Sequence, residues 1–350
     1  MRTWLSLMVA VTAGCGDTPL DGASAFCDLP TAFLAEGGPG VDGIPSLQDP
    51  PLVEPTHPDA AYVRDGDRII GLVIDGEAVA IPLNIGWWHE VVHVTVGGQD
   101  LLVTHCPLTG SSLVFDRATV GGVAFGVSGL LFMSNLVLFD RGAEPSLWPQ
   151  MARGARCGPA RGSSLTMVGA VEMRWDAWRR LHPETRVVSD ETGFARDYQR
   201  YPYGSYDQLN NISVTFPVPG LDPRRLPKER VLGVPDGEGG VAFPFLALDA
   251  LGAVAQVPVV RPGQSYVVFW DRAAQAAIAV RPQVDGQSLT FTITDGSITD
   301  RQTGSVWDVM GVAQGGPLTG RRLPLVPEAY VAFWFAWSLF EPDAALWTGP

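Results

Sequence analysis

The sequence predicts a mainly β, α+β protein made of two tandem copies of a β-rich unit, each ending in a short aromatic-rich helix. Among its 350 residues are 40 glycines and 29 prolines, too many turn formers for an architecture of long helices. Hydrophobic residues make up 46% and charged residues 17%, which supports a large core and excludes a mostly disordered chain. Similar segments recur about 160 residues apart, the sign of a duplication.

The charge balance excludes one class of partner. The chain has 37 acidic and 24 basic residues, for a net charge of -13. Such an acidic surface repels phosphate backbones, so we expect no nucleic-acid binding. Lys228 is the only lysine in the sequence, which leaves one candidate for lysine-based covalent catalysis.

Residues 1–15 are typical of a signal peptide with a lipobox-like end. Arg2 supplies a positive start, and an apolar stretch at 4–13 is too short to span a bilayer. Small residues precede Cys15, where we expect lipid attachment. The chain is then an exported protein on the periplasmic side of a bacterial membrane, with the lipid anchor contacting that membrane. The alternative is a soluble periplasmic or secreted protein. Residues 16–59, rich in Gly, Pro and Asp, read as a tether and lead-in segment.

Export changes how the remaining cysteines are interpreted. Cys27, Cys106 and Cys157 are an odd number in an oxidising compartment, so one disulfide and one free thiol is the simplest arrangement. We expect Cys106 to stay free and a Cys27–Cys157 disulfide to tie the lead-in segment to the first unit. Three buried, unpaired thiols are the alternative.

The two copies are expected at residues 60–190 and 228–345, joined by a Tyr- and Pro-rich crossover at 191–227. Arg68 and Gly71 match Arg230 and Gly233, and the helical stretches are expected at 173–181 and 327–340. Within the copies, a hairpin is predicted over 68–82 around an Asp-Gly turn. Short apolar runs predict the other strands, at 101–104, 111–115, 122–127, 135–139, 265–270, 277–280 and 288–294.

A candidate site lies in the first copy, where His89, His93, His105 and Cys106 fall within eighteen positions. The second copy has no imidazole or thiol at the matching positions, with Val260 and Arg261 opposite the last two. Positions that differ between copies with a shared scaffold are the better candidates for function.

Three interpretations of this site remain open. The two imidazoles and the thiolate suit copper or zinc, with Met133 as a weak axial copper ligand, and indicate metal-binding or redox chemistry. Alternatively, Cys106 is the nucleophile of a cysteine-dependent enzyme, with a histidine as base and Asn135 or Ser128 as an orienting or oxyanion group. The third interpretation is a non-catalytic scaffold or interaction protein, in which a buried polar cluster only holds loops together.

The segment 89–93 also matches the HExxH pattern of zinc proteases, in which Glu90 would activate water. The β-branched residues at 91, 92 and 94–96 favour a strand, and two glycines at 97–98 would end a helix at once. We therefore do not expect a metalloprotease.

Several motifs together resemble the bacterial domain-of-unknown-function family 3179. These are GWWHE (86–90), THCPLTG (104–110), FGVSGL (125–130), SNL (134–136), PYGSY (202–206) and LPKERVLG (226–233). They cover most of the mature chain in one order. The resemblance implies an exported bacterial protein and gives weight to His89, Glu90, Cys106 and Asn135, whereas His93 departs from the family's pattern. It implies no particular activity.

Overall fold

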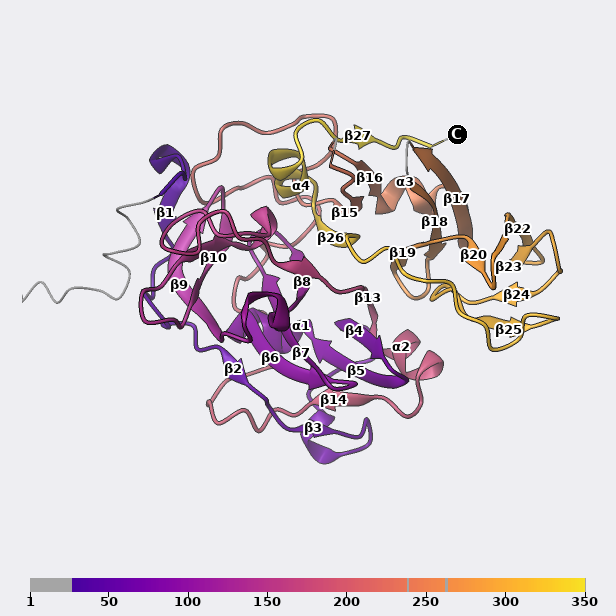
Figure 1. The fold of residues 1–350 in the computed structure, drawn as a ribbon, viewed down its shortest axis with the longest axis horizontal. Helices are drawn as coiled ribbons and strands as arrows, with labels where there is room; N and C mark the ends of the chain where they lie inside the picture. The colour runs from indigo at the N-terminus through magenta and orange to yellow at the C-terminus, as the bar shows by residue number, and fades with distance from the viewer. Residues whose placement is uncertain (1–26, 238, 262–263, 350) are drawn as a thin grey trace, which may run out of the picture.

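The computed structural model describes residues 27–237, 239–261 and 264–349, and the prediction of a mainly β protein is confirmed (Figure 1). Strands make up 39% of the chain and helices 12%. The lipid-attachment site expected at Cys15 lies outside the described residues. In the described part of the chain, no helix is both long and apolar enough to cross a membrane.

Three sheets form the first half of the molecule. The first has the order β13-β4-β5-β14-β3 and consists of β3 (Leu52–Val53), β4 (Arg68–Ile74), β5 (Glu77–Pro82), β13 (Val171–Arg174) and β14 (Arg186–Val188). The second has the order β12-β8-β7-β6-β2 and consists of β2 (Leu47–Gln48), β6 (Val91–Val96), β7 (Gln99–Cys106), β8 (Ser111–Asp116) and β12 (Thr166–Met167). The third has the order β1-β9-β10-β11 and consists of β1 (Leu34–Glu36), β9 (Phe125–Phe132), β10 (Asn135–Asp140) and β11 (Leu147–Pro149).

Three larger sheets and a short hairpin form the second half. One sheet has the order β26-β15-β16-β27 and consists of β15 (Arg230–Val234), β16 (Val241–Pro244), β26 (Tyr330–Phe333) and β27 (Ala345–Leu346). Another contains β17 (Val254–Arg261), β18 (Gln264–Asp271) and β19 (Ala276–Val280). The last contains β22 (Phe291–Thr294), β23 (Ser297–Asp300), β24 (Val306–Trp307) and β25 (Ala313–Gly315), and the hairpin pairs β20 (Gln283–Val284) with β21 (Gln287–Ser288).

The described helices are all short. The α-helices are α1 (Leu83–His89), α2 (Trp175–Leu181), α3 (Phe245–Asp249) and α4 (Trp334–Phe340). The 3-10 helices are η2 (Thr31–Phe33), η3 (Pro58–Ala60), η4 (Arg117–Val120) and η5 (Gln150–Ala152). The aromatic-rich stretch at 327–340, expected to be helical throughout, starts as strand β26 and becomes helical only at Trp334. Its first part pairs with β15, and aromatic residues suit a buried strand as well as a helix.

The predicted hairpin over 68–82 is formed by β4 and β5. Its two turn residues, Asp75 and Gly76, have φ of 48° and 85°. Left-handed values at both positions are typical of a type I′ turn, whose twist matches that of the flanking strands. The β-branched run after Glu90 forms β6, as its composition predicts.

The lead-in segment does more than a tether would. From Cys27 onward it adds an edge strand to each sheet of the first half: β1 pairs with β9, β2 with β6 and β3 with β14. Its glycines and prolines separate strands of only two or three residues, which is why its composition reads as loop. The predicted disulfide between Cys27 and Cys157 is present, and Cys106 is free and buried.

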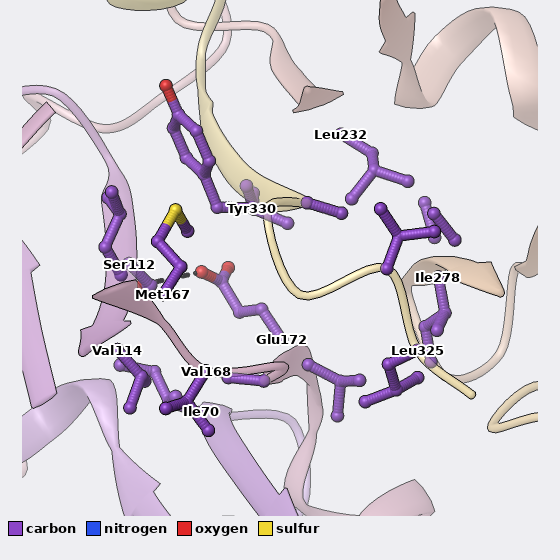
Figure 2. A pocket seen from close by; sticks show the side chains of 18 residues that line it. Ile70, Ser112, Val114, Met167, Val168, Glu172, Leu232, Ile278, Leu325 and Tyr330 are labelled. Carbon is purple, nitrogen blue, oxygen red and sulfur yellow. Dashed lines mark hydrogen bonds between the residues drawn. The ribbon is translucent and has the colours of Figure 1, made fainter. Parts of the chain in front are cut away.

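The two halves lie side by side and share a core (Figure 1). Strand β26 of the second half reaches the first, where the Phe333 N–H donates to the Thr109 carbonyl at 2.8 Å. Figure 2 shows this junction, with the Glu172 carboxylate among apolar side chains such as Ile70, Leu232 and Tyr330. A buried carboxylate in such surroundings needs fixed partners, and these partners belong to the site described next.

Candidate functional site

The end of β7 carries two of the predicted site residues on opposite faces of its sheet. His105 and Cys106 are adjacent in the strand, so their side chains point in opposite directions. His105 lines a polar cavity, whereas Cys106 belongs to an apolar cluster with Leu136 and Trp148. Strand alternation thus prevents the two from acting as neighbouring ligands of one metal.

Cys106 lies where a thiolate is disfavoured. Its side chain is 1% exposed, and its Sγ contacts the Ser134 carbonyl at 3.9 Å. Burial raises the pKa of the Cys106 thiol to about 11, and the nearby Glu90 carboxylate contributes to the increase. The thiol therefore stays protonated near neutral pH, the opposite of what an activated cysteine nucleophile requires.

His89, the last residue of α1, uses both ring nitrogens in hydrogen bonds. Nδ1 lies 2.8 Å from the Pro45 carbonyl oxygen, and Nε2 lies 2.7 Å from the Tyr198 hydroxyl. Burial lowers the pKa of His89 to about 4, so the ring is neutral at physiological pH. Its nitrogens join the lead-in segment to the crossover, and neither is left for a metal or for Cys106.

His93, in β6, is committed in the same way. Its Nε2 accepts a hydrogen bond from the Phe125 backbone N–H at 2.9 Å, so the ring proton lies on Nδ1. Nδ1 faces the Leu47 carbonyl at 3.1 Å. Burial lowers the pKa of His93 to about 4. His93 therefore fixes β2 and the start of β9 against β6.

The predicted copper or zinc site, with His89, His93, His105 and Cys106 as ligands, is not assembled. No group of three or more His, Cys, Asp or Glu side chains in the described residues is placed to hold a metal ion. Helix α1 ends at His89 and strand β6 begins at Val91, so the HExxH residues do not share a helical face. Met133, considered as an axial ligand, packs instead with the cluster around Cys27 and Cys157.

Asn135 belongs to a buried polar network. Its amide donates to Gln150 Oε1 at 2.8 Å and to Thr109 Oγ1 at 3.0 Å, and its Oδ1 accepts from the Met151 N–H at 2.9 Å. Ser111 and Gln150 close the network with a 2.6 Å hydrogen bond. All these groups have partners, so Asn135 holds β10 against the β7–β8 turn and has no donor directed at a substrate.

Ser128 also has a local role. Its Oγ donates to the Val137 carbonyl at 2.6 Å and accepts from the Leu130 N–H at 3.0 Å. These bonds lie beside the register shift between β9 and β10, which occurs between Leu136 and Leu138. Ser128 satisfies backbone groups that the irregular ladder leaves unpaired, and the oxyanion role expected for it has no support in its contacts.

Glu90 is the predicted site residue with the most unusual surroundings. It ends α1 in the left-handed region with φ 58°, a position that glycine or asparagine usually occupies. Its carboxyl is 5% exposed and interacts with Tyr203 of the crossover. Burial raises the pKa of Glu90 to about 8. A strained backbone and a shifted carboxyl pKa at one residue are typical of functional sites.

Glu90 lines a cavity of about 340 Å³. Most of the wall is apolar, and the polar lining groups include Glu90, Tyr203 and Tyr206. The apolar lining side chains are Pro39, Ile44, Leu108, Val127, Leu130, Leu131, Leu136 and Phe216. The volume falls in the range of small-molecule sites, and an apolar wall with a few convergent polar groups is their usual composition.

His105 faces a second, smaller cavity of about 150 Å³. Its Nδ1 lies 3.0 Å from Ser112 Oγ, which donates to Glu172 Oε2 at 2.8 Å, the dashed bond of Figure 2. Because Ser112 gives its proton to Glu172, His105 donates from Nδ1 and keeps Nε2 as an acceptor. Arg68 Nε bonds to Glu172 Oε1 at 2.6 Å.

Sequence reasoning missed most of the residues in the two cavities. Arg68 and Arg230 occupy matching positions in the two predicted copies. Residues shared by both copies are attributed to the common scaffold, so neither arginine was a candidate for function. The density of tyrosines in the crossover indicated that their side chains are buried. It did not indicate which cavity these side chains line.

Lys228, the one candidate for lysine-based covalent catalysis, has a role that the sequence does not indicate. It is 1% exposed and donates to the Ser213 carbonyl at 2.6 Å, with its Nζ 3.6 Å from the centroid of the Tyr206 ring. This contact is a cation–π interaction that fastens the crossover to the second half.

Element order also changes one comparison between the halves. The β6–β7 and β17–β18 hairpins each follow the first helix of their half, so His105 and Cys106 stand opposite Trp270 and Asp271. This alignment of the hairpins differs from the sequence-based pairing with Val260 and Arg261, which stays a prediction. The second half still has no imidazole or thiol at these positions.

Comparison with known proteins agrees with the motifs. No curated protein and no solved structure matches the chain. The family described as "Protein of unknown function (DUF3179)" matches residues 41–344, a range that contains every described candidate residue and, apart from Gly37 and Pro39, all residues that line the two cavities. The chain therefore belongs to the DUF3179 family.

Proposed function

We propose that the protein binds a small, mainly apolar molecule in the cavity lined by Glu90 and that Glu90 exchanges a proton with it. The observation that carries this proposal is an ionisable carboxyl held in a left-handed backbone conformation at the wall of an apolar cavity. The strain of such a backbone conformation costs about 1–3 kcal/mol, and burying the carboxyl adds to that cost. A glycine at this position would avoid both costs.

The surroundings of Glu90 suit general acid–base chemistry. Below its pKa of about 8 the carboxyl is neutral and donates a hydrogen bond, and above it the carboxylate accepts a proton. The Tyr203 hydroxyl lies close enough to the carboxyl to interact with it. Cys106, which interacts electrostatically with Glu90, keeps its thiol protonated and adds no competing charge. The reaction class is proton transfer to or from a bound molecule.

Binding of anilinonaphthalene sulfonate, followed by its fluorescence between pH 6 and 10, tests the proposal. Wild type is expected to bind the probe below pH 8 and to lose affinity above it, because ionised Glu90 repels the sulfonate. Glu90→Gln should bind without this pH dependence. Leu131→Trp, which fills the cavity, should not bind. Ile212→Trp, at a 69% exposed position, is the matched control and should behave as wild type.

Two results would overturn the proposal. One is a pH profile of Glu90→Gln that matches wild type. The other is normal probe binding by Leu131→Trp. Calorimetry in two buffers of different ionisation enthalpy adds an independent readout, because wild type should take up or release protons on binding near pH 8 and Glu90→Gln should not.

We also propose that the protein is exported and lipid-anchored at Cys15. The positive residue at position 2, the apolar stretch at 4–13 and the small residues before Cys15 support a lipoprotein signal. The Cys27–Cys157 disulfide is typical of an oxidising compartment. Cys15→Ser should move the protein from the membrane fraction to the soluble fraction without changing its unfolding midpoint. Wild type in the soluble fraction would contradict the anchor and leave the soluble periplasmic or secreted alternative.

A further inference from the structure

The second cavity, about 150 Å³ in volume, collects charged groups from both halves of the molecule. Arg68 comes from β4, Arg230 from β15, and His105 from the end of β7. Trp87 of α1, together with Tyr201 and Asp207 of the crossover, completes one wall. A polar cavity between two halves, closed by a crossover, is a common position for a small-molecule site.

Some of these charges have partners within the protein. Arg68 bonds to Glu172 through Nε and to the Gln275 carbonyl through Nη1 at 3.1 Å. Glu172 receives a second hydrogen bond from Ser112. Asp67, which also lines the cavity, accepts from the Arg64 backbone N–H at 2.9 Å and from the Asn84 amide at 3.1 Å.

Two charges of opposite sign make no hydrogen bond among the described residues, although the Arg230 guanidinium lies over the Phe333 ring, 5.7 Å from its centroid. The Arg230 guanidinium makes no hydrogen bond to any described residue, and its nearest carboxylate contact is Glu172 at 4.0 Å. Asp207 forms no ion pair within the described part of the chain, although it interacts electrostatically with Arg230. Arg68 Nη2 is buried and finds no hydrogen-bond partner among the described residues. The cavity wall therefore holds the Arg230 guanidinium and the Asp207 carboxylate without hydrogen-bond partners among the described residues, whereas the unpaired Arg68 Nη2 is closed to solvent.

Arg230 lines the cavity and its side chain is partly accessible. Its side chain is 29% exposed although it lies deep among surrounding residues, which is the property of a group on a cavity wall. The His105 ring packs against Gly86, where an added Cβ would come 2.9 Å from His105 Cβ. Gly86 thus leaves room for the ring, and His105 Nε2 is available as an acceptor.

We propose that this cavity binds a small zwitterion of the α-amino acid type, with its carboxylate on Arg230 and its ammonium group on Asp207. A carboxylate matches the fork of guanidinium donors. Binding of a simple anion would leave the Asp207 carboxylate without a counter-charge, and binding of a simple amine would leave the Arg230 guanidinium without one. A molecule that carries both charges therefore satisfies the site best. Trp87 and Phe333 supply apolar and aromatic walls for its side chain.

Isothermal titration calorimetry with L-amino acids tests this proposal. The titrants are the twenty L-amino acids, with propionate and ethylamine as the single-charge analogues of alanine. At least one amino acid is expected to bind, and propionate and ethylamine should not bind measurably. Arg230→Gln and Asp207→Asn should each weaken binding at least about tenfold, because each removes a charged partner. Arg321→Gln breaks an exposed ion pair with Asp285 and is the matched control, with unchanged affinity.

Three results would overturn the proposal. These are no heat of binding from any amino acid, propionate binding as tightly as alanine, or unchanged affinity in both Arg230→Gln and Asp207→Asn. Circular dichroism establishes that each variant is folded, and the half-buried Asp207 decides the question if Arg230→Gln does not fold. Glu90→Gln should bind the amino acid normally, so failure here is distinguishable from failure of the Glu90 proposal.

Discussion

Glu90 stores unfavourable free energy at a single residue, through its left-handed backbone and its buried carboxyl. Its pKa, raised by burial to about 8 from 4.5, makes that cost depend on pH. The native state holds the proton more tightly than the unfolded chain does. Stability from this residue is therefore complete below pH 4.5 and is lost as pH rises through 8.

The first prediction follows from this linkage. Between pH 4.5 and 8, wild type should lose free energy of unfolding relative to Glu90→Gln by up to about 1.4 kcal/mol per pH unit. Urea unfolding of both proteins at several pH values measures the difference. Glu36→Gln, at an exposed acidic position, is the control and should track wild type. Parallel curves for wild type and Glu90→Gln would show that the carboxyl ionises normally.

Cys106 gives a second prediction at this scale. Because its thiol is 1% exposed and its pKa is raised to about 11, it should react with iodoacetamide only slowly at pH 7.5 in the folded protein. Mass spectrometry after timed quenching measures the reaction. Denaturation in guanidinium should make the same thiol react rapidly, which controls for reagent quality. Rapid alkylation of the native protein would restore Cys106 as a nucleophile.

At the scale of elements, each half places a tryptophan of its last helix over a glycine of a central strand, β4 in the first half and β15 in the second. Trp178 of α2 covers Gly71 of β4, and Trp337 of α4 covers Gly233 of β15, so closely that an added Cβ would overlap the ring. A second shared contact joins Trp148 Nε1 to Asp140 at 2.7 Å and Trp307 Nε1 to Asp300 at 3.0 Å. These matched contacts support the predicted tandem copies.

The third prediction tests these helix–strand contacts. Gly71→Ala and Gly233→Ala should each lower the free energy of unfolding by about 1–3 kcal/mol, because the methyl group displaces a buried indole. Gly220→Ala, where an added Cβ meets nothing within 4 Å, should change stability little. Urea denaturation followed by tryptophan fluorescence provides the measurement. Stability equal to wild type in both variants would mean that the indole rings shift at no cost.

Local patterns predicted the elements well because their causes are local. The Asp-Gly turn specifies the β4–β5 hairpin, and β-branched residues specify β6. The candidate site depended on side-chain direction, which a pattern of residue types does not contain. Alternation along β7 separates His105 from Cys106, and the change from α1 to β6 at Glu90 separates His89 from His93. Glu90 was a candidate through the HExxH pattern and the resemblance to the family. Its cavity could not be predicted, because Tyr203 and Tyr206 of the crossover form part of the wall and their positions depend on the tertiary fold.

At the scale of the whole molecule, the Cys27–Cys157 disulfide joins two distant parts of the sequence. Cys27 and Cys157 are 130 residues apart in the sequence. The fourth prediction is that the double variant Cys27→Ser, Cys157→Ser loses about 2–5 kcal/mol of unfolding free energy. Urea midpoints measure the loss, and dithiothreitol should reproduce it in wild type while leaving the double variant unchanged. Equal midpoints of wild type and double variant would mean that β1, β2 and β3 alone hold the lead-in segment.

The same disulfide sets a distance from the membrane. With lipid attached at Cys15, as proposed, twelve residues lead from the anchor to Cys27, where the chain is covalently joined to Cys157. Fully extended, that length of chain reaches about 40 Å. The disulfide thus fixes the far end of a short tether, and the folded protein stays within about 40 Å of the lipid surface. Without the bond, only weaker contacts would hold this end, such as the 3.1 Å hydrogen bond from the Asp28 N–H to the Arg156 carbonyl and the burial of Leu29, so the redox state of one bond would decide how firmly both cavities are kept near the bilayer.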